Sequence, residues 1–278
     1  MVHFVGAGTG ATDLITVRGQ RLIENADVII YAGSLINKDL LRAAKTGCEM
    51  HDSAAMTLSE IIDVIKAAAA KNKDIVRLHT GEPSIYGAVR EQMDELDKAG
   101  IEYDSCPGVS AAFGAASSLN IEYTLPGITQ TLIITRMEGR TEVPELEKIE
   151  ALAAHHTSMA IYLSSGMMER VQEALIKGGL SPDTPAAIVY KATWDDEKIL
   201  RCHVRELTLT GMEAGIDRLA VILVGEAIEH TSYDRSRLYS EDFSTGYRDS
   251  KKKAAGSRGS RKRAAAIWNS GIRSGKLR

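Results

Sequence analysis

Apolar runs with strand character alternate with helix-spaced apolar residues along the first hundred positions of the chain. The runs lie at 2–6, 27–31, 74–79 and 101–106, with a weaker one near 48–50. Apolar positions between these runs recur at the spacing of a helix face. This alternation predicts an α/β domain whose sheet is largely parallel and carries helices on its faces.

Two helices are the clearest of this first set. One is expected to begin after Thr57, because Thr57 and Glu60 have the T-x-x-E spacing of a capping box. The other is expected from about 85 to 98, with Tyr86 and Val89 among the apolar residues on one side. Both apolar stripes are interpreted as packing faces.

A second α/β pattern follows a stretch rich in small residues. The stretch PGVSAAFGAASSLNIEYTLPG (107–127) predicts a short helix and then an irregular link. Further apolar runs lie at 131–135, 159–165, 186–190, 198–204 and 218–226, and helices are expected at 143–155 and 166–177. We expect the runs at 198–204 and 218–226 to pair in a partly antiparallel sheet.

The fold class is therefore α/β, with two α/β domains. The N-terminal domain, with a largely parallel sheet, is expected at 1–113, and a link follows at 114–127. The C-terminal domain, with a mixed sheet, is expected at 128–247. A length of 278 residues agrees with two domains, since single cores rarely grow beyond about 250 residues.

Composition and charge restrict the class of protein further. Hydrophobic residues make up 44% of the chain, no long uncharged apolar run is present, and the N-terminus lacks signal-peptide character. We therefore expect a cytoplasmic protein without a membrane partner. Cys48, Cys106 and Cys202 are far apart and form no C-x-x-C pair, so neither a disulfide framework nor a metal site is expected.

The C-terminal segment 248–278 differs from the rest of the chain in charge. It carries eleven Lys or Arg residues and one acidic residue, which leaves residues 1–247 with a net charge of −13. Few apolar residues and many like charges predict a disordered tail. The tail is interpreted as a dispensable extension, with an arm that binds nucleic acid or a protein partner as the alternative. No nucleic-acid partner is expected for the acidic body.

Glycine-containing loops follow several predicted strands of the first domain. They are GAGTG (6–10), YAGSL (31–35), HTGEPSIYG (79–87) and CPGVSA (106–111). Ligands of open α/β sheets bind outside the carboxyl ends of strands, where small residues let the backbone approach them. Gly81 clears space and Pro83 stiffens its loop, which favours a ligand without phosphates that lies along main-chain atoms.

The first loop also fits a different class of ligand. Gly6, Gly8 and Ala11 match the relaxed dinucleotide pattern G-x-G-x-x-A. However, the second strand ends without the acidic residue that would bind ribose hydroxyls, and the helix after Gly10 is delayed. A nicotinamide-binding oxidoreductase is therefore kept as the remote alternative.

The segments GAGTGATDLITVRG, HTGEPSIYG and PGVSA resemble signatures of the class III S-adenosylmethionine-dependent tetrapyrrole methyltransferases. The resemblance covers nearly all of residues 1–230. YAGSLIN (31–37), TQTLIITRMEGRTEVPELEKI (129–149) and VYKATWDDEKI (189–199) are similar to a branch that acts in cobalamin biosynthesis. The resemblance implies the tetrapyrrole methylase fold, a homodimer, and a cleft between the two domains that holds S-adenosylmethionine and a tetrapyrrole substrate.

The resemblance also implies site residues when it is carried over position by position. The implied cofactor contacts are Gly81, Glu82, Ser84, Ile85, Ser110, Ala111, Tyr162, Leu163, Ala187 and Tyr190. The chain departs from the family at Glu82, where Asp is usual, and at Asp195, where Pro is common. A related enzyme acting on another tetrapyrrole, a protein or ribosomal RNA shares the cofactor loops and stays open as an alternative.

The implied reaction transfers a methyl group from a sulfonium to a ring carbon. Such a donor is already activated, so the reaction needs orientation more than acid or nucleophilic catalysis. No catalytic side chain is therefore expected, and the adjacent His155 and His156 are interpreted as surface residues. Because the substrate carries many carboxylates, Arg136, Arg140 and Lys191, which lie just after predicted strands, are the candidate substrate-binding residues.

Overall fold

The structure is a computed structural model that describes residues 1–229 and 232–250. Both sheets lie within one compact unit, Met1–Tyr233, and a second unit begins at Asp234. In the second unit, Arg248 donates to the carbonyls of Leu238 and Ser240, both at 2.8 Å. Most of the tail predicted at 248–278 lies outside the described residues.

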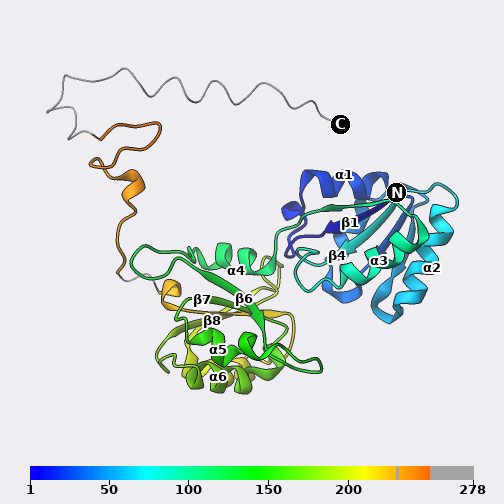
Figure 1. Ribbon diagram of the computed structural model, residues 1–278. Coiled ribbons are helices and arrows are strands. Elements are labelled where there is room, and N and C mark those ends of the chain that lie inside the picture. Colours follow the sequence, from blue (N-terminus) through cyan, green and yellow to red (C-terminus); the bar gives the residue numbers. More distant parts are fainter. Residues whose placement is uncertain (230–231, 251–278) are drawn as a thin grey trace. The chain divides into compact units, whose positions relative to one another are not determined.

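The first sheet is wholly parallel and confirms the predicted α/β pattern. Its strands are β1 (Val2–Gly6), β2 (Val28–Tyr31), β3 (Glu49–Asp52), β4 (Ile75–His79) and β5 (Tyr103–Cys106), in the order β3-β2-β4-β1-β5. Its helices are α1 (Val17–Asn25), α2 (Leu58–Ala69) and α3 (Val89–Ala99). Helix α1 packs on one face, and α2 and α3 pack on the other (Figure 1).

Local sequence signals explain where α2 begins. Thr57 accepts a hydrogen bond from the Glu60 amide at 3.3 Å, and the Glu60 carboxylate accepts one from the Thr57 amide at 2.7 Å. The predicted capping box is thus confirmed. Ile61, Ile62 and Ile65 face the sheet and are buried, and each such side chain contributes about 1.5–3 kcal/mol of burial free energy.

The predicted start of α3 is wrong by four residues. Tyr86 and Ala88 have φ values of +56° and +49°, in the left-handed region, so the right-handed helix begins only at Val89. Tyr86, expected on the packing face, is instead 45% exposed. The helix ends at Ala99, and the capping residue Gly100 is also left-handed, as is common at helix C-termini.

The second sheet is mixed, as predicted. Its strands are β6 (Leu132–Arg136), β7 (Ser158–Tyr162), β8 (Pro185–Tyr190), β9 (Lys198–His203) and β10 (Ala220–Val224), in the order β6-β7-β10-β8-β9. Only β6 and β7 are parallel neighbours; the other pairings are antiparallel. The expected pairing of β9 with β10 is wrong, because β8 forms a hairpin with β9 and lies between them.

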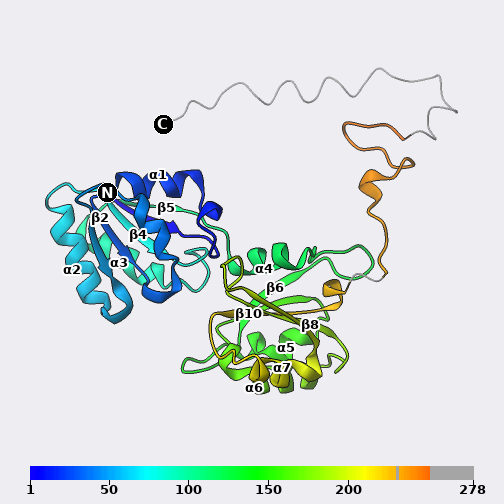
Figure 2. The ribbon, with the colours of Figure 1, turned by 180° about the vertical axis from the view of Figure 1, so that it is seen from behind.

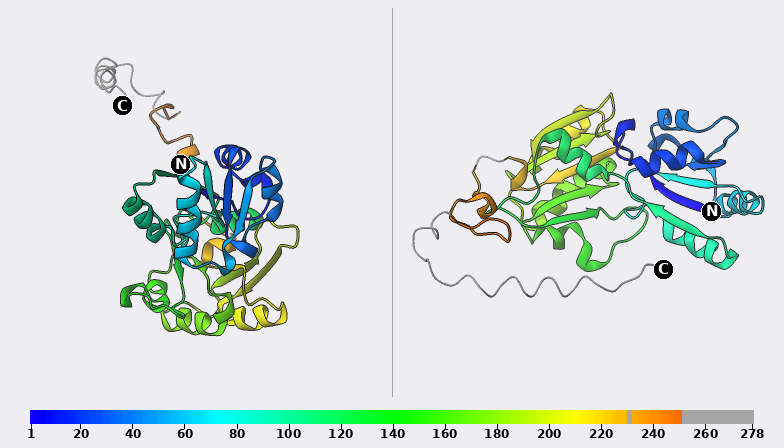
Figure 3. Two further views of the ribbon diagram at one scale, coloured as in Figure 1. Left: turned by 90° about the vertical axis from the view of Figure 1, so that its right-hand side faces the viewer. Right: turned by 90° about the horizontal axis from the view of Figure 1, so that it is seen from above.

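Helices cover both faces of this sheet. Helices α5 (Ile149–Ala153), α6 (Met168–Lys177) and α7 (Leu207–Glu213) lie on one face and α4 (Ala111–Leu119) on the other (Figure 2). Two further views also show helices against the faces of each sheet (Figure 3). The helix predicted at 143–155 is shorter than expected, because Pro144 opens a separate turn at Glu145–Glu147. Helix α7 was not predicted.

Short 3-10 turns connect many of these elements. They are Thr12–Leu14, Gly33–Leu35, Lys38–Ala43, Ser53–Ala55, Glu145–Glu147, Ser165–Met167, Val204–Glu206, Glu226–Ile228 and Arg237–Tyr239. The first of them occupies the delay that the sequence predicted between β1 and α1. Helix α1 therefore begins well beyond the first glycine loop.

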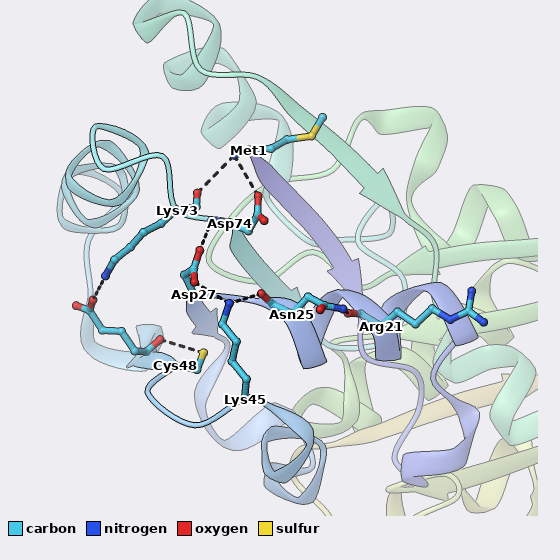
Figure 4. Close-up of polar contacts among 9 residues, drawn as sticks. Met1, Arg21, Asn25, Asp27, Lys45, Cys48, Lys73 and Asp74 are labelled. Atoms are coloured by element: carbon cyan, nitrogen blue, oxygen red, sulfur yellow. Dashed lines mark hydrogen bonds and ion pairs between the residues drawn. The ribbon is translucent and has the colours of Figure 1, made fainter.

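Charged and polar groups tie together the amino ends of the strands in the first sheet (Figure 4). The Asp27 carboxylate pairs with Lys45 at 2.7 Å and accepts from the Asp74 amide at 2.8 Å. Lys73 pairs with Glu49 at 3.1 Å. The hydrogen bond from Lys45 holds the pKa of Asp27 below its usual value. This network fixes the edge opposite the glycine loops.

The described residues can be searched for membrane-spanning helices and metal-ligand clusters, and they show how far the cysteines and the His155–His156 pair are buried. No helix there has the length and apolar character needed to cross a membrane. Likewise, no group of three or more His, Cys, Asp or Glu side chains in the described ranges could hold a metal ion. Cys106 and Cys202 are buried, and Cys48 is half-buried. His155 and His156 are exposed, as expected.

Candidate active site

Four glycines bring the carboxyl ends of β1, β4 and β5 into close backbone contact. Gly8 and Gly81 exchange hydrogen bonds of 3.3 and 2.9 Å between their main-chain groups. A Cβ on Gly108 would lie 2.1 Å from the Gly81 oxygen, and one on Gly6 would lie 2.6 Å from the Gly108 Cα. The loops therefore approach each other more closely than side chains permit, and they form a continuous floor.

Gly81 also borders an opening that a side chain would fill. Its φ is +62°, and a Cβ there would lie 3.7 Å from the Ser110 Cα and 3.8 Å from the Ala111 nitrogen. These are ordinary contact distances, so a group of about the size of a methyl fits between the β4 loop and the start of α4 at this point. A small group of a ligand fits where the side chain is missing.

The Glu82 carboxylate connects two of these loops. One oxygen accepts from the Gly108 amide at 2.8 Å and the other from the Ser84 amide at 3.0 Å. Burial alone would raise the pKa of the Glu82 carboxyl, but these amide donors outweigh it and hold the pKa below its usual value. The longer side chain, compared with the usual Asp, thus reaches across to the β5 loop. Ser84 is exposed and Ile85 is half-buried.

Tyr162 joins the end of β7 to the beginning of α4. Its hydroxyl lies 2.7 Å from the Ser110 hydroxyl and accepts a hydrogen bond of 2.7 Å from the Ala112 amide. Burial raises the pKa of the Tyr162 phenol, which keeps it neutral. Next to it, Leu163 has a left-handed φ of +54° and is 66% exposed. The structure therefore brings Tyr162 to Ser110 and to the first turn of α4, which begins at Ala111; the role of these residues and of Leu163 in cofactor binding stays a prediction.

The loop after β8 contacts the loop after β1, a contact that the sequence analysis missed. The Trp194 indole donates to the Thr9 carbonyl at 3.0 Å, and the Thr193 hydroxyl lies 2.6 Å from the Thr9 hydroxyl. The Ala11 amide also donates to the Thr193 hydroxyl at 3.1 Å. A Cβ on Gly10 would lie 2.0 Å from the Trp194 ring. The available signal was a tryptophan, one of two in the chain, at the end of a strand.

The candidate substrate cations are each engaged differently. Arg136 donates to the carbonyls of Met137, Thr141 and Glu142 at 3.2, 3.2 and 2.9 Å, so its guanidinium braces its own loop. Arg140, in that loop, is exposed.

Lys191 is held by its own segment. It pairs with Asp196 at 2.6 Å and lies 5.4 and 5.2 Å above the rings of Tyr190 and Trp194. The pKa of Lys191 is raised by the Asp196 contact, which keeps it charged. Arg140 is therefore the least engaged of the three candidate cations in these contacts.

A pocket of about 240 Å³ lies between Tyr86, β6 and the segment that follows β6. Its lining comprises Tyr86, Ile133, Ile134, Thr135, Arg136, Glu142, Val143, Pro144, Glu147 and Leu152. The Tyr86 ring centre lies 5.8 Å from that of Tyr162. Of the candidate cations, only Arg136 lines this pocket.

Two implied cofactor residues lie on β8. Ala187 is fully buried in the core beneath α4, so its side chain presents no surface to a ligand in this structure. Tyr190 is half-buried and lies beside Lys191 and Lys198. The roles of both residues stay predictions.

The open floor suits an S-adenosyl group better than a dinucleotide. Ile85 is half-buried and Leu163 is exposed, so both side chains have surface that a ligand can contact. A pyrophosphate would need a helix N-terminus at the first glycine loop, but α1 begins only at Val17. The geometry therefore favours the ligand without phosphates.

Comparison with known proteins places the chain among related sequences. A profile of the tetrapyrrole (corrin/porphyrin) methylases matches residues 1–208. The chain is 50% identical over 252 residues to a cobalt-precorrin-4 C(11)-methyltransferase of Methanocaldococcus jannaschii, covering 91% of this chain and 97% of that one. It is 40% identical over 240 residues to a precorrin-4 C(11)-methyltransferase of Mycobacterium tuberculosis, covering 86% and 96%.

Solved structures give the same picture. A cobalt precorrin-4 methyltransferase, determined by X-ray crystallography, superposes with a TM-score of 0.81 at 44% identity and covers 82% of this chain and 95% of its own. A uroporphyrin-III C-methyl transferase from Thermus thermophilus, complexed with S-adenyl homocysteine, has a TM-score of 0.69 at 22% identity, covering 82% and 98%. The second likeness concerns the fold alone.

Proposed function

Because the chain belongs to the tetrapyrrole (corrin/porphyrin) methylase family, it is a methyltransferase, and we propose that it methylates C-11 of precorrin-4 or of its cobalt form. The product would be precorrin-5 or cobalt-precorrin-5, in the biosynthesis of the cobalamin ring. One observation carries this proposal: identity of 50% extends over 97% of a relative that bears this name.

We propose S-adenosylmethionine as the methyl donor, held at the glycine floor. Gly81 and Ser110 border the opening described above, Tyr162 contacts Ser110, and the exposed Leu163 follows Tyr162, so these four residues would hold it. When bound, this cofactor supplies a methyl group on a sulfonium. The residues of the chain then have to orient the donor and the macrocycle, and orientation can contribute about 7–11 kcal/mol to such a reaction.

The substrate side of the site is proposed to lie beside Tyr162. Its pocket carries Arg136, and the exposed Arg140 follows in the same loop. Guanidinium groups suit the peripheral carboxylates of a tetrapyrrole. Lys191 would add a further cation, although Asp196 already neutralises part of its charge. We further propose that the enzyme acts as a homodimer in the cytoplasm.

The test is incubation with labelled S-adenosylmethionine and a system that generates precorrin-4, followed by location of the label. Label at C-11 of the macrocycle is the expected result. Label at another ring carbon, in added protein or in added ribosomal RNA would replace the proposal with one of the alternatives.

Binding measurements test the remaining alternative. Titration with S-adenosylhomocysteine is expected to give saturable binding, whereas NAD(H) is expected to give none. The reverse result would indicate a nicotinamide enzyme.

A further inference from the structure

A buried arginine lies in the strand that precedes the Gly81 loop. Arg77, on β4, is 5% exposed; its Nε donates to the Gln92 Oε1 at 3.0 Å and its Nη1 donates to the Ile30 carbonyl at 3.3 Å. Both of these acceptors are uncharged. Burying a guanidinium against neutral acceptors is unfavourable, and burial lowers the pKa of Arg77 to about 10. A residue of this kind needs an explanation beyond core packing.

Gln92 connects Arg77 to the turn before α3 by hydrogen bonds. It is 4% exposed, and its Nε2 donates to the Ala88 carbonyl at 3.0 Å. Ala88 is the residue before the helix, and no side chain caps α3 there. Arg77 thus orients Gln92 through its oxygen, and Gln92 holds Ala88 through its nitrogen.

The turn that receives this contact is conformationally demanding. Tyr86 and Ala88 both have left-handed φ values, and a Cβ on Gly87 would lie 2.2 Å from the Pro83 oxygen. Left-handed residues other than glycine persist only where their surroundings fix them. The hydrogen bond from Gln92 is such a constraint, because it anchors the carbonyl at the end of the turn.

The turn presents one large side chain to the proposed substrate site. Tyr86 is 45% exposed, its ring lies 5.8 Å from that of Tyr162, and it lines the pocket that contains Arg136. A flat phenol ring at a pocket wall is suited to contact the face of an aromatic or conjugated ring.

We propose that Arg77 and Gln92 are positioning residues that fix the 86–88 turn, so that Tyr86 contacts the tetrapyrrole. This inference rests on the proposed function, since it assigns a specificity contact within that substrate's site. Tyr86 touches the substrate, whereas Gln92 acts only through the backbone of the turn.

The decisive variant is Gln92→Glu. A glutamate still accepts from Arg77, and now with opposite charge, but it cannot donate to the Ala88 carbonyl. We expect the tetrapyrrole KM to rise about fivefold, the size of one hydrogen bond, while the melting temperature does not fall. The Kd of S-adenosylhomocysteine should stay within about twofold.

Tyr86→Ala and the double variant complete the test. Tyr86→Ala should raise KM at least as much, and adding Gln92→Glu to it should cause no further rise, because residues that act as one unit are not additive. Gln172→Glu is the matched control: Gln172 accepts from Thr208, a glutamate can do the same, and KM should not change.

Three results would overturn the inference while wild-type enzyme still methylates precorrin-4. They are an unchanged KM in Gln92→Glu, multiplied effects in the double variant, or an equal rise in the cofactor Kd. Failure of the wild-type enzyme to methylate precorrin-4 would instead overturn the proposed function, so the two failures are distinguishable.

Discussion

At the scale of single residues, Gly81 combines a left-handed backbone with a small space that Ser110 and Ala111 border. Gly47 has a similar backbone, with φ of +85°, but a Cβ there would meet nothing within 4 Å. Valine variants at these two positions therefore distinguish a loss of cofactor affinity caused by backbone strain from one caused by filling the site.

We expect Gly81→Val to weaken binding of S-adenosylhomocysteine at least about tenfold, because the side chain would occupy the space beside Ser110. Gly47→Val should bear comparable backbone strain and keep wild-type affinity. Calorimetric titration and a melting curve for each variant provide the comparison. Equal affinities for folded Gly81→Val and wild type would mean that this loop is only a structural corner.

Arg136 and Arg140 differ in what they already bind, and their variants should differ accordingly. Removing a charged contact to a substrate carboxylate costs roughly 1.5–3 kcal/mol, about a ten- to hundredfold rise in tetrapyrrole KM. Arg140→Ala should show this with an unchanged melting temperature, since Arg140 is exposed. Arg136→Ala should also lower the melting temperature, because Arg136 holds three carbonyls.

The affinity for S-adenosylhomocysteine shows whether these two arginines bind the substrate or support the site as a whole. The Kd of S-adenosylhomocysteine should hardly change in either variant. Parallel shifts of KM and Kd would indicate that the arginines support the cleft rather than the substrate, and no shift in either would leave them as solvated residues.

At the scale of elements, the segment after β8 stabilises the loop after β1 through Thr193. Its hydroxyl contacts the Thr9 hydroxyl and accepts from the Ala11 amide. We expect Thr193→Val to weaken S-adenosylhomocysteine binding about fivefold, since a well-placed hydrogen bond is worth about 1 kcal/mol. Thr193→Ser retains the hydroxyl and should bind like wild type. If the two variants bound equally, the contact between these loops would be irrelevant to the cofactor.

Elements defined by local signals could be predicted, and those defined by distant contacts could not. The capping box at Thr57 and the buried strands are local, and both are present. The late start of α3 depends on the left-handed turn at Tyr86 and Ala88, which helical spacing of apolar residues does not reveal. The position of β8 between β9 and β10 is likewise a matter of pairing that hydrophobic pattern alone leaves open.

At the scale of the whole molecule, the same distinction holds for the site. The glycine loops could be predicted to meet, because parallel strands bring their carboxyl ends to one edge. Thr193 and Trp194 contact Thr9 from the other sheet, 184 and 185 residues away, and no periodicity indicates that contact. Arg77 and His79 lie in a strand whose residues are all buried, although arginine and histidine are residue types that are seldom fully buried.

The buried His79 is expected to make the stability of the fold depend on pH. It is 5% exposed, it stacks on Phe4 with ring centres 6.0 Å apart, and its Nε2 has no hydrogen-bond partner among the described residues. Burial, aided by the nearby Arg77, lowers the pKa of His79 to about 3. In an unfolded chain the pKa is about 6.5. Between these values the unfolded state binds a proton that the folded state excludes.

The free energy of unfolding should therefore fall as the pH drops below about 6.5, by about 2 kcal/mol between pH 7.5 and pH 5. In that range most carboxylates stay ionised, so the histidine contribution can be separated from general acid unfolding. His79→Leu removes the titrating group without removing a hydrogen bond of Nε2, and its stability should be nearly flat over the same range. Urea unfolding at several pH values measures both slopes. The exposed His155→Gln serves as the control and should keep the wild-type slope; an equally steep slope in His79→Leu would show that the buried imidazole does not set the pH dependence.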